Sequence, residues 1–378
     1  MSQNKSILIL SRSDSAEKYG GDLFLLHSFK KILVNSGYNV KDECDCLCSL
    51  DGIDAVFAIN LDRPFENYIM LQRCQKKNIK FFIYTLHHPI NGIEKYLSSE
   101  YLSGIRGVVS FLSCRNFFAY ESLVSLLRLV SSNKFSYYLY SFGVISKYSM
   151  KALLNKSTCL LVANELEKEA IENELSVVVE RYEILPHIYD PHKTYKSMPV
   201  KKDRLIVCAG RIEPRKNQLG LLDVVSDLEE YEFVFVGGSN PTAKSYHDVF
   251  TNRADKLKNV TVIDFMPLED LRLLLENAEV FISLSYFEVV SLTELEAYSL
   301  FCKMVLTENS YIKEHISGSS VKYVDPGDYD KIVKSIKALS EHELDFEERK
   351  SIVYGPKIKD LSLNSVSERL NRVMLEYL

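Results

Sequence analysis

Short apolar runs alternate with helical patterns along most of the chain. In the first half, the runs rich in strand-forming residues lie at 6–10 (SILIL), 55–59 (AVFAI), 80–85 (KFFIYT) and 159–163 (CLLVA). Stretches with helical periodicity lie between them, such as 23–35 and 165–174. Strands that alternate with helices are typical of a parallel sheet with helices on its faces, so the pattern predicts an α/β fold.

The second half repeats this rhythm, with strand candidates at 204–209 (RLIVCA), 232–236, 260–263 and 280–285. Residues 186–203 between the halves hold three prolines, four lysines and little apolar periodicity, which is typical of a linker. We therefore predict two Rossmann-like domains, 1–192 and 193–378, with the boundary near Lys193. The last segment, 363–378, predicts an amphipathic helix with a capping box between Ser365 and Glu368.

Length and composition allow two cores. The chain has 378 residues, 46% of them hydrophobic, and no apolar run approaches the roughly 18 residues of a membrane-spanning helix. No secretory pattern opens the sequence, so we expect a cytoplasmic protein. Eight dispersed cysteines predict free thiols. The cluster CDCLC at 44–48 is interpreted either as incidental thiols on one face of a strand or as part of a metal site.

The net charge of −5 is unevenly distributed. Residues 63–164 contain 13 Lys or Arg against 4 acids, together with 17 of the 42 Phe and Tyr residues. A basic, aromatic surface suits an anionic partner, such as a membrane face or a phosphorylated glycolipid. The alternative is that the aromatics are core and the lysines only solvate helices. No nucleic-acid recognition motif accompanies the charge, so nucleic acid is not an expected partner.

Two loops after predicted strands carry candidate chemistry. The first, GRIEPRKNQ, begins at Gly210, which permits a tight turn, and places Arg211 and Lys216 ahead of a helix that starts near Gln218. Cations beside a helix N-terminus favour a diphosphate. The second loop, YFEVVSLTELEAYSL, places Glu288 outside a helix N-terminus and Glu296 just over one turn inside it.

The spacing of Ser291 and Glu294 predicts a capping box, with Ser291 as the N-cap and Leu292 as the first helical residue. A carboxylate in the position of Glu296 can accept hydrogen bonds from the vicinal hydroxyls of a ribose. Both loops follow the carboxyl ends of strands, where open α/β sheets bind ligands.

Together, GRIEPRKNQ and the Glu-x7-Glu element resemble the retaining GT-B glycosyltransferases of family 4, over nearly the whole chain and most strongly over 204–307. The resemblance implies two Rossmann-like domains that face each other across a cleft, an N-terminal one for the acceptor and a C-terminal one for a nucleotide sugar. It implies that Arg211 and Lys216 hold the diphosphate, Glu296 the ribose and Glu288 the transferred sugar. Backbone groups of Val290, Ser291 and Leu292 would contact phosphate or sugar, and the base would lie near Phe265.

The first domain contributes two further matches to this family. Gly20 and Gly21, in YGGDLFLLHSF, resemble the loop that lets the backbone approach donor and acceptor. His87 and His88, in TLHHPING, resemble the position of a histidine that faces the reacting sugar, and the sequence leaves open which of them does so. A structural histidine at a strand end is the alternative.

The chain departs from the family at two places. Val289, Val290 and Ser291 replace a glycine-containing run after Glu288, and Phe301, Cys302 and Lys303 replace a Gly-x-Pro after the helix. A valine where glycine is usual restricts the backbone and the approach of a donor.

A metal-dependent transferase would instead hold its nucleotide through an Asp-x-Asp motif. The chain offers Asp328-Tyr329-Asp330, whose position before a helix favours capping. We therefore expect no metal and no cofactor, with the charge of the leaving diphosphate offset by Arg211, Lys216 and the helix dipole.

The leading hypothesis is a cytoplasmic enzyme, either free or bound to the inner face of a membrane. It would move a sugar from a nucleotide donor, UDP rather than GDP, to a hydroxyl of a glycan or lipid-linked acceptor. Bacterial surface polysaccharide synthesis is the expected setting. The alternatives are a GT-B epimerase or hydrolase of nucleotide sugars, and a scaffold subunit with a degenerate site.

Overall fold

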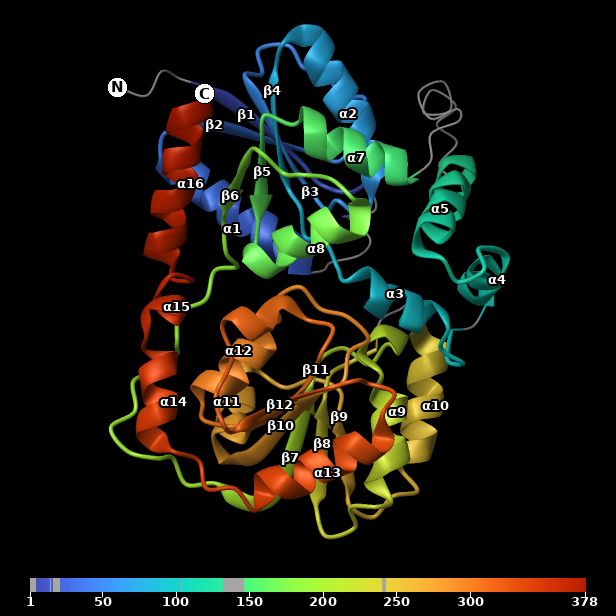
Figure 1. Cartoon of the computed structure of the whole chain (residues 1–378), viewed down its shortest axis with the longest axis vertical. Coiled ribbons are helices and arrows are strands. Elements are labelled where there is room, and N and C mark those ends of the chain that lie inside the picture. The colour runs from blue at the N-terminus through green and yellow to red at the C-terminus, as the bar shows by residue number, and fades with distance from the viewer. Residues whose placement is uncertain (1–4, 14, 16–20, 103, 132–145, 240–242) are drawn as a thin grey trace. The chain divides into compact units, whose positions relative to one another are not determined.

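The structure is a computed structural model that describes residues 5–13, 15, 21–102, 104–131, 146–239 and 243–378. The chain forms two compact units (Figure 1). The first comprises Met1–Ile90, Ser103–Ile188 and Asp360–Leu378, and the second comprises Asn91–Leu102 and Tyr189–Lys359. The chain thus passes between the units near residue 90, near 102, near 188 and again near 359, whereas the sequence predicts one boundary near Lys193.

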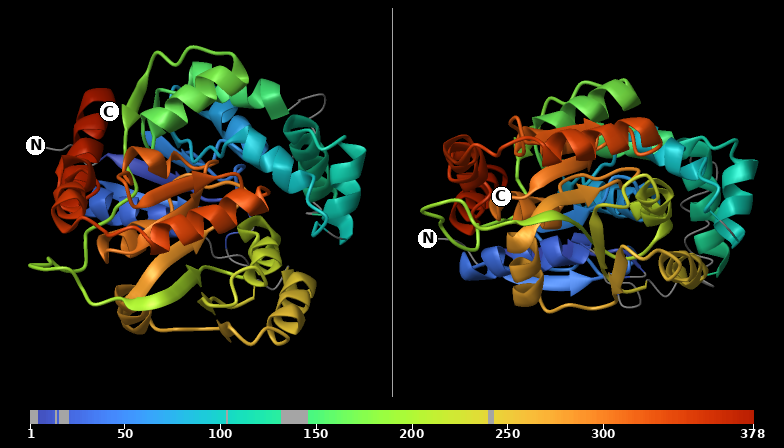
Figure 2. Two further views of the ribbon diagram at one scale, coloured as in Figure 1. Left: turned by 60° about the horizontal axis from the view of Figure 1, so that its bottom comes forward. Right: turned by 90° about the horizontal axis from the view of Figure 1, so that it is seen from below.

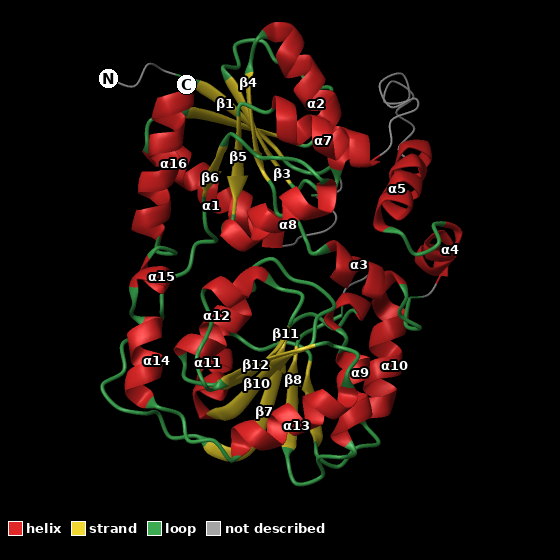
Figure 3. Cartoon of the chain, viewed as in Figure 1, coloured by secondary structure: helices red, strands yellow, loops and turns green. Residues whose placement is uncertain are grey.

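The first unit holds a six-stranded parallel sheet in the order β2-β1-β3-β4-β5-β6 (Figure 3). Its strands are β1 (Ser6–Leu10), β2 (Asn39–Glu43), β3 (Ala55–Ile59), β4 (Lys80–Tyr84), β5 (Cys159–Val162) and β6 (Tyr182–Ile184). Its helices are α1 (Gly21–Asn35), α2 (Pro64–Lys77), α4 (Gly104–Leu112), α5 (Phe117–Ser131), α7 (Ser146–Lys156), α8 (Glu165–Leu175) and α16 (Leu363–Tyr377). Helix α1 packs with α16, and α2 packs with α7.

The second unit holds another six-stranded parallel sheet, in the order β12-β11-β10-β7-β8-β9. Its strands are β7 (Lys202–Ala209), β8 (Glu232–Val236), β9 (Val260–Ile263), β10 (Ala278–Ser283), β11 (Lys303–Thr307) and β12 (Val321–Val324). Its helices are α3 (Ile90–Leu97), α9 (Gln218–Val225), α10 (Lys244–Ala254), α11 (Leu268–Asn277), α12 (Leu292–Ser299), α13 (Tyr329–Ser340), α14 (Phe346–Val353) and α15 (Pro356–Lys359), with short 3₁₀ turns η1 (Pro214–Lys216) and η3 (Tyr311–Glu314). Helix α9 packs with α10 and α13, and α11 packs with α12.

Central strands of both sheets are buried on both faces, which is why their sequences are continuous apolar runs. All eight strands predicted from such runs are present, so the α/β prediction of two Rossmann-like sheets is confirmed. Edge strand β2 (NVKDE) carries three acidic or basic side chains and is mostly exposed, so its sequence gives no apolar signal.

Three local predictions are refined by the structure. The C-terminal helix is present as α16, but its N-cap is Ser362, whose side chain accepts from the Ser365 backbone N–H. All eight cysteines are free thiols, and the CDCLC cluster lies in the turn after β2 rather than on a strand. Within the described residues, no helix is both long enough and apolar enough to cross a bilayer.

Candidate active site

The predicted diphosphate loop and the Glu-x7-Glu loop both lie at the carboxyl ends of the strands of the second sheet. Strands β7 and β10 are parallel neighbours, with Ile206 opposite Val280 and Val207 opposite Phe281. The chain winds outward in opposite directions from this pair, through β8 and β9 on one side and β11 and β12 on the other. Such a reversal in strand order opens a crevice at the carboxyl edge, which is where these sheets bind ligands.

Glu288 joins the two loops through ion pairs. Its Oε1 accepts from Lys216 Nζ at 2.5 Å and from the Arg215 guanidinium at 2.9 Å, and the residue is only 8% exposed. The Glu288 backbone is fixed as well, because its N–H donates to the Asn309 carbonyl at 3.0 Å. The structure therefore brings together the acid predicted to meet the sugar and a cation predicted to meet the diphosphate.

The two arginines of this loop differ. The guanidinium of Arg215 lies between Glu288 and Glu213; burial lowers its pKa, but these two carboxylates outweigh burial and raise it. Arg211 is half-exposed and reaches Glu213 at 3.4 Å. Arg215 is thus held between two carboxylates, whereas Arg211 is the most exposed of the three cations in this loop.

Gly210 has the role predicted for it. Its φ of 151° lies in the region that favours glycine, and a Cβ atom there would lie 3.6 Å from Lys216 Cε. Neighbouring Gly237 matters more for packing, since a Cβ on it would come within 2.0 Å of the Gly210 carbonyl oxygen. Glycines at the ends of β7 and β8 therefore let the two backbones meet beneath the lysine.

Helix α12 begins as predicted, at Leu292 after the N-cap Ser291. The prediction of a capping box is wrong, because the Ser291 side chain makes no capping hydrogen bond and the Glu294 side chain is buried. Val289 and Val290 are buried, and neither has a positive φ. Valine therefore fits the backbone at these two positions, where the family resemblance leads one to expect a glycine-containing run.

Glu294 is a buried acid that sequence reasoning assigned to the helix cap. Its side chain is fully enclosed, with Glu288, Lys216 and Ser283 among its polar neighbours. Burial, and then the negative charge of Glu288, raise the pKa of Glu294 to about 8. This carboxyl is therefore protonated at neutral pH beneath the Glu288 loop.

Glu296 and Phe265 are two further residues predicted to contact the donor. Glu296 is mostly buried on α12 and accepts from Arg272 Nε of α11 at 2.6 Å. Phe265 follows β9 and is 81% exposed, so its ring is available to a planar ligand. Glu296 forms no ion pair with Lys216 or Arg211.

After α12, the chain turns at Phe301, whose φ of 66° is left-handed. The Phe301 and Cys302 N–H groups donate to the Tyr298 and Ala297 carbonyls at 3.1 Å, which is the Schellman closure that usually carries glycine. The ring is buried against Tyr195 and Phe346, each with a centroid distance of 5.2 Å. Aromatic packing thus holds a side chain where the family has glycine.

His87 and His88 lie in the first unit and share Asp62. His87 is completely buried, pairs through Nδ1 with Asp62, and pairs through Nε2 with Glu174 at 2.8 Å. Burial alone would lower the pKa of His87, but Asp62 and Glu174 raise it to about 10. His88 Nδ1 lies 2.8 Å from Asp62, and its side chain is 22% exposed. His88 is therefore the better placed of the two to meet a ligand.

The glycine pair predicted for the first unit is only partly described. Gly21 is the exposed first residue of α1, and a Cβ atom there would meet nothing within 4 Å. Gly20 lies outside the described residues.

Helix α3, from the first half of the sequence, packs in the second unit against the loop that precedes Glu288. A Cβ on Gly92 would lie 2.4 Å from the Tyr286 carbonyl oxygen, so only glycine allows this approach. The Tyr96 ring lies 6.0 Å from the ring of Tyr286 and 5.9 Å from that of Phe287. Strand and helix patterns alone do not indicate this contact, because it joins segments almost 200 residues apart.

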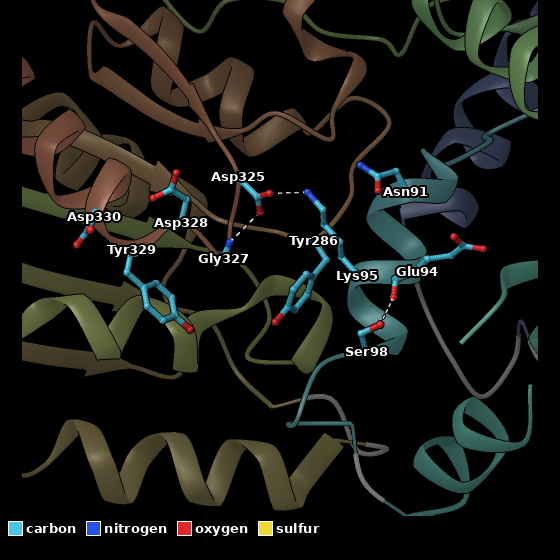
Figure 4. A pocket seen from close by; sticks show the side chains of 10 residues that line it. All are labelled: Asn91, Glu94, Lys95, Ser98, Tyr286, Asp325, Gly327, Asp328, Tyr329 and Asp330. Atoms are coloured by element: carbon cyan, nitrogen blue, oxygen red, sulfur yellow. Dashed lines mark hydrogen bonds and ion pairs between the residues drawn. The ribbon is translucent and has the colours of Figure 1, made fainter. Parts of the chain in front are cut away.

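The same helix forms one wall of a pocket of about 900 Å³ (Figure 4). Its lining residues are Asn91, Glu94, Lys95, Ser98, Tyr286, Asp325, Gly327, Asp328, Tyr329 and Asp330. Lys95 of α3 bonds to Asp325, after β12, at 2.5 Å. None of the predicted site residues lines this pocket.

The Asp-x-Asp match has the capping role predicted for it. Asp328 is the N-cap of α13, and its carboxylate accepts from the Lys331 backbone N–H at 3.0 Å. In the part of the chain that the structure describes, no cluster of three His, Cys, Asp or Glu residues is arranged to hold a metal ion.

Comparison with known proteins agrees with this architecture. Residues 190–357 match the family model described as "Glycosyl transferases group 1". No curated protein sequence matches the chain significantly.

Solved structures resemble the chain over almost its full length. Sucrose-phosphate synthase from Thermosynechococcus elongatus has a TM-score of 0.69 at 13% identity, with 98% of each chain covered. Anabaena HepE in complex with UDP-glucose has a TM-score of 0.64 at 12% identity, covering 98% of this chain and 99% of that one. A trehalose-6-phosphate synthase studied for glycosyl transfer with retention has a TM-score of 0.62 at 10% identity, covering 98% and 99%.

At these identities the structural matches establish the fold, and the family match covers the unit that holds Glu288, Arg211 and Lys216. Residues 190–357, which lie in the second unit, are thus similar to the group 1 glycosyl transferases, and the chain as a whole has the two-unit GT-B fold.

Proposed function

We propose that the protein is a glycosyltransferase that moves a sugar from a nucleotide donor to a hydroxyl of a glycan or lipid-linked acceptor. The observation that carries the proposal is the joining of Glu288 to Lys216 at the carboxyl edge between β7 and β10. There an acid for sugar hydroxyls and a cation for a diphosphate meet beside the N-terminus of α12.

In the reaction, the bond between the anomeric carbon and the diphosphate oxygen breaks, and a bond from that carbon to the acceptor oxygen forms. The acceptor proton leaves with the diphosphate oxygen. We propose retention of configuration, which is supported by the family resemblance and by the trehalose-6-phosphate synthase neighbour. The cations supply the stabilisation that the departing diphosphate needs.

We propose Arg211 and Lys216 for the diphosphate, Glu296 for the ribose, Glu288 for the transferred sugar and Phe265 for the base. Backbone groups at Val290, Ser291 and Leu292, and at Gly20 and Gly21, complete the proposed contacts. Of the two histidines, His88 is the one we propose to meet the sugar, because both ring nitrogens of His87 are bound to carboxylates.

UDP is the proposed nucleotide, in keeping with the UDP-glucose complex of the HepE neighbour. Because Arg211 and Lys216 can offset the diphosphate charge, we propose that no divalent cation is required. Transfer should then persist in excess EDTA. Complete loss of transfer in EDTA, with recovery on adding Mg²⁺ or Mn²⁺, would contradict this part of the proposal. The acceptor that we propose is a bacterial surface polysaccharide precursor.

The test is incubation with a panel of UDP- and GDP-sugars, with and without glycan acceptors, followed by NMR of the anomeric carbon of the product. A transferase gives an acceptor-dependent glycoside with the anomeric configuration of the donor and only slow release of sugar without acceptor. Full conversion of the donor in the absence of acceptor would identify an epimerase or hydrolase. Absence of both turnover and nucleotide binding would identify a degenerate scaffold.

A further inference from the structure

Helix α4 of the first unit presents an apolar ridge to solvent. Ile105, Val108, Phe111 and Leu112 are 76%, 59%, 77% and 65% exposed. Their spacing of three, six and seven residues from the first places them on one face of the helix. Ser110, on the opposite side of the helix, and Val109, at the flank of the ridge, are buried, and α4 packs against α5.

The ridge is accessible along its length. Figure 2 shows α4 and α5 side by side in both views, at the periphery of the first unit and away from its sheet. Large apolar side chains scattered singly over a surface are ordinary, but four on one face of a nine-residue helix form a continuous patch.

The two charged side chains within residues 104–119 are both basic. Arg106 and Arg115 are exposed, and this range contains no Asp or Glu. The nearest acids in the chain are Glu100, which is exposed, and Glu121, which is buried. A helix with aliphatic and Phe side chains on one face and an arginine on the polar side, followed by a second arginine, matches the boundary between the acyl chains and headgroups of an anionic bilayer.

The structure also narrows the basic, aromatic window predicted at 63–164. Of its Phe and Tyr residues that the structure describes, only Phe111 and Tyr148 are exposed, while the others are buried or partly buried. Most of the aromatic residues that the structure describes in this window are therefore buried or partly buried, as the alternative interpretation expected. The most exposed apolar side chains described in the window lie on α4, and Leu126 and Leu127 of α5 are about half-exposed.

We propose that α4 docks the protein on an anionic membrane, with Ile105, Val108, Phe111 and Leu112 inserted among the acyl chains and Arg106 and Arg115 on lipid phosphates. Charge complementarity favours an anionic bilayer over an uncharged apolar groove of a partner protein, because the charged side chains of residues 104–119 are both cationic and attract a negatively charged surface. The inference goes beyond the proposed reaction and does not depend on it.

Cosedimentation with vesicles tests the inference. The full chain is mixed with vesicles of phosphatidylcholine alone and of phosphatidylcholine with 30% phosphatidylglycerol, chosen as roughly the anionic content of a charged membrane face. We expect binding to the anionic vesicles, at least tenfold weaker binding to the neutral ones, and a further loss as salt is raised because headgroup attraction is screened.

Two double variants separate the two contributions. Ile105→Ser with Phe111→Ser should reduce binding at least tenfold at all salt concentrations, whereas Arg106→Gln with Arg115→Gln should abolish the preference for anionic lipid. The matched control is Val178→Ser with Leu375→Ser, which removes two equally exposed apolar side chains elsewhere in the same unit. All positions are exposed, so thermal unfolding should be unchanged.

The inference fails if the wild type binds neither kind of vesicle, or if the α4 variants bind as well as the control. It also fails if the wild type is a dimer that the α4 substitutions dissociate without any vesicle binding, because the ridge would then cover a second copy of the chain. Transfer to a soluble acceptor, measured in parallel, reports on the proposed reaction separately, since these variants leave the second unit intact.

Discussion

Glu288 and Lys216 are joined by an ion pair of 2.5 Å between loops that follow adjacent strands. Arg215 contacts the same carboxylate oxygen at 2.9 Å, so one carboxylate is shared by two cations at the carboxyl edge of the sheet. In the proposed site, a diphosphate would compete with Glu288 for Lys216. The ion pair would then set how strongly Lys216 attracts a nucleotide.

Glu288→Gln should have opposite effects on nucleotide binding and on transfer. Loss of the negative charge releases Lys216, so UDP alone should bind about three- to tenfold more tightly. Transfer should fall about 100-fold, because the amide replaces the acid proposed to meet the sugar. Calorimetry with UDP and a turnover assay measure the two effects. Glu230→Gln, an exposed acid of the same unit, is the control. Weaker UDP binding in Glu288→Gln would show that the ion pair with Lys216 favours nucleotide binding instead of competing with it.

Glu294 makes stability fall as pH rises. Its ordinary pKa of 4.5 is raised to about 8 in the folded protein, so above pH 4.5 the folded state retains a proton that the unfolded state loses. The associated loss of stability grows between pH 4.5 and pH 8. Glu294→Gln cannot ionise, so its free energy of unfolding should exceed that of the wild type by an amount that grows with pH and reaches about 3–5 kcal/mol at pH 8. Urea unfolding at pH 5, 6.5 and 8 measures this. A constant difference between the two proteins over that range would mean that Glu294 is not buried as described.

His87 contributes stability with the opposite dependence on pH. Its pKa is raised from 6.5 to about 10 by Asp62 and Glu174, so its contribution is complete below pH 6.5 and declines as pH rises toward 10. Below pH 6.5, His87→Gln should destabilise the protein by about 2–4 kcal/mol, since it removes a fully buried cation that pairs with the buried Asp62 and with the partly exposed Glu174. Denaturant unfolding between pH 6 and 9 measures the trend.

His88→Gln is the matched control for His87→Gln, because it removes a partly exposed partner of the same Asp62. It should cost about 1 kcal/mol or less. Equal losses in the two variants would contradict the enclosed, doubly paired position of His87.

Phe301→Gly should destabilise the protein although it relieves backbone strain. Glycine removes roughly 1–2 kcal/mol of left-handed strain at this position, but loss of a buried Phe costs about 3–5 kcal/mol. We expect a net loss of about 2–3 kcal/mol in thermal unfolding. A variant as stable as the wild type would show that the stack with Phe346 and Tyr195 contributes little.

The sequence was sufficient for eight of the twelve strands that the described residues form, because buried parallel strands such as AVFAI and VFISLS are continuous apolar runs. The sequence analysis did not predict β2, β6, β11 or β12. The sequence was also sufficient for the N-terminal ends of α9 and α12, which place Lys216 and Glu288 in loops. Edge strand β2 was missed, because exposed polar residues form it through pairing with β1 and not through burial.

The fine structure of the site depends on tertiary contacts that no local pattern encodes. The spacing of Ser291 and Glu294 predicts a cap, but the interior beneath Glu288 accommodates the Glu294 side chain instead. Likewise, Arg211 and Arg215 are equivalent in the sequence, and only the folded loop shows that Arg215 is enclosed by Glu213 and Glu288. Gly92 has no local signal, since its role depends on Tyr286 across the unit.

The most direct test of the donor site is the dissociation constant of UDP for the wild type and for Lys216→Met, measured by calorimetry. The control is Lys322→Met, at an exposed position of β12. Loss of a charged hydrogen bond to the diphosphate should weaken binding at least about tenfold in Lys216→Met and leave the control unchanged. If the wild type binds no UDP, or if Lys216→Met binds it as tightly as the wild type does, then the site between β7 and β10 is not the nucleotide site proposed for this protein.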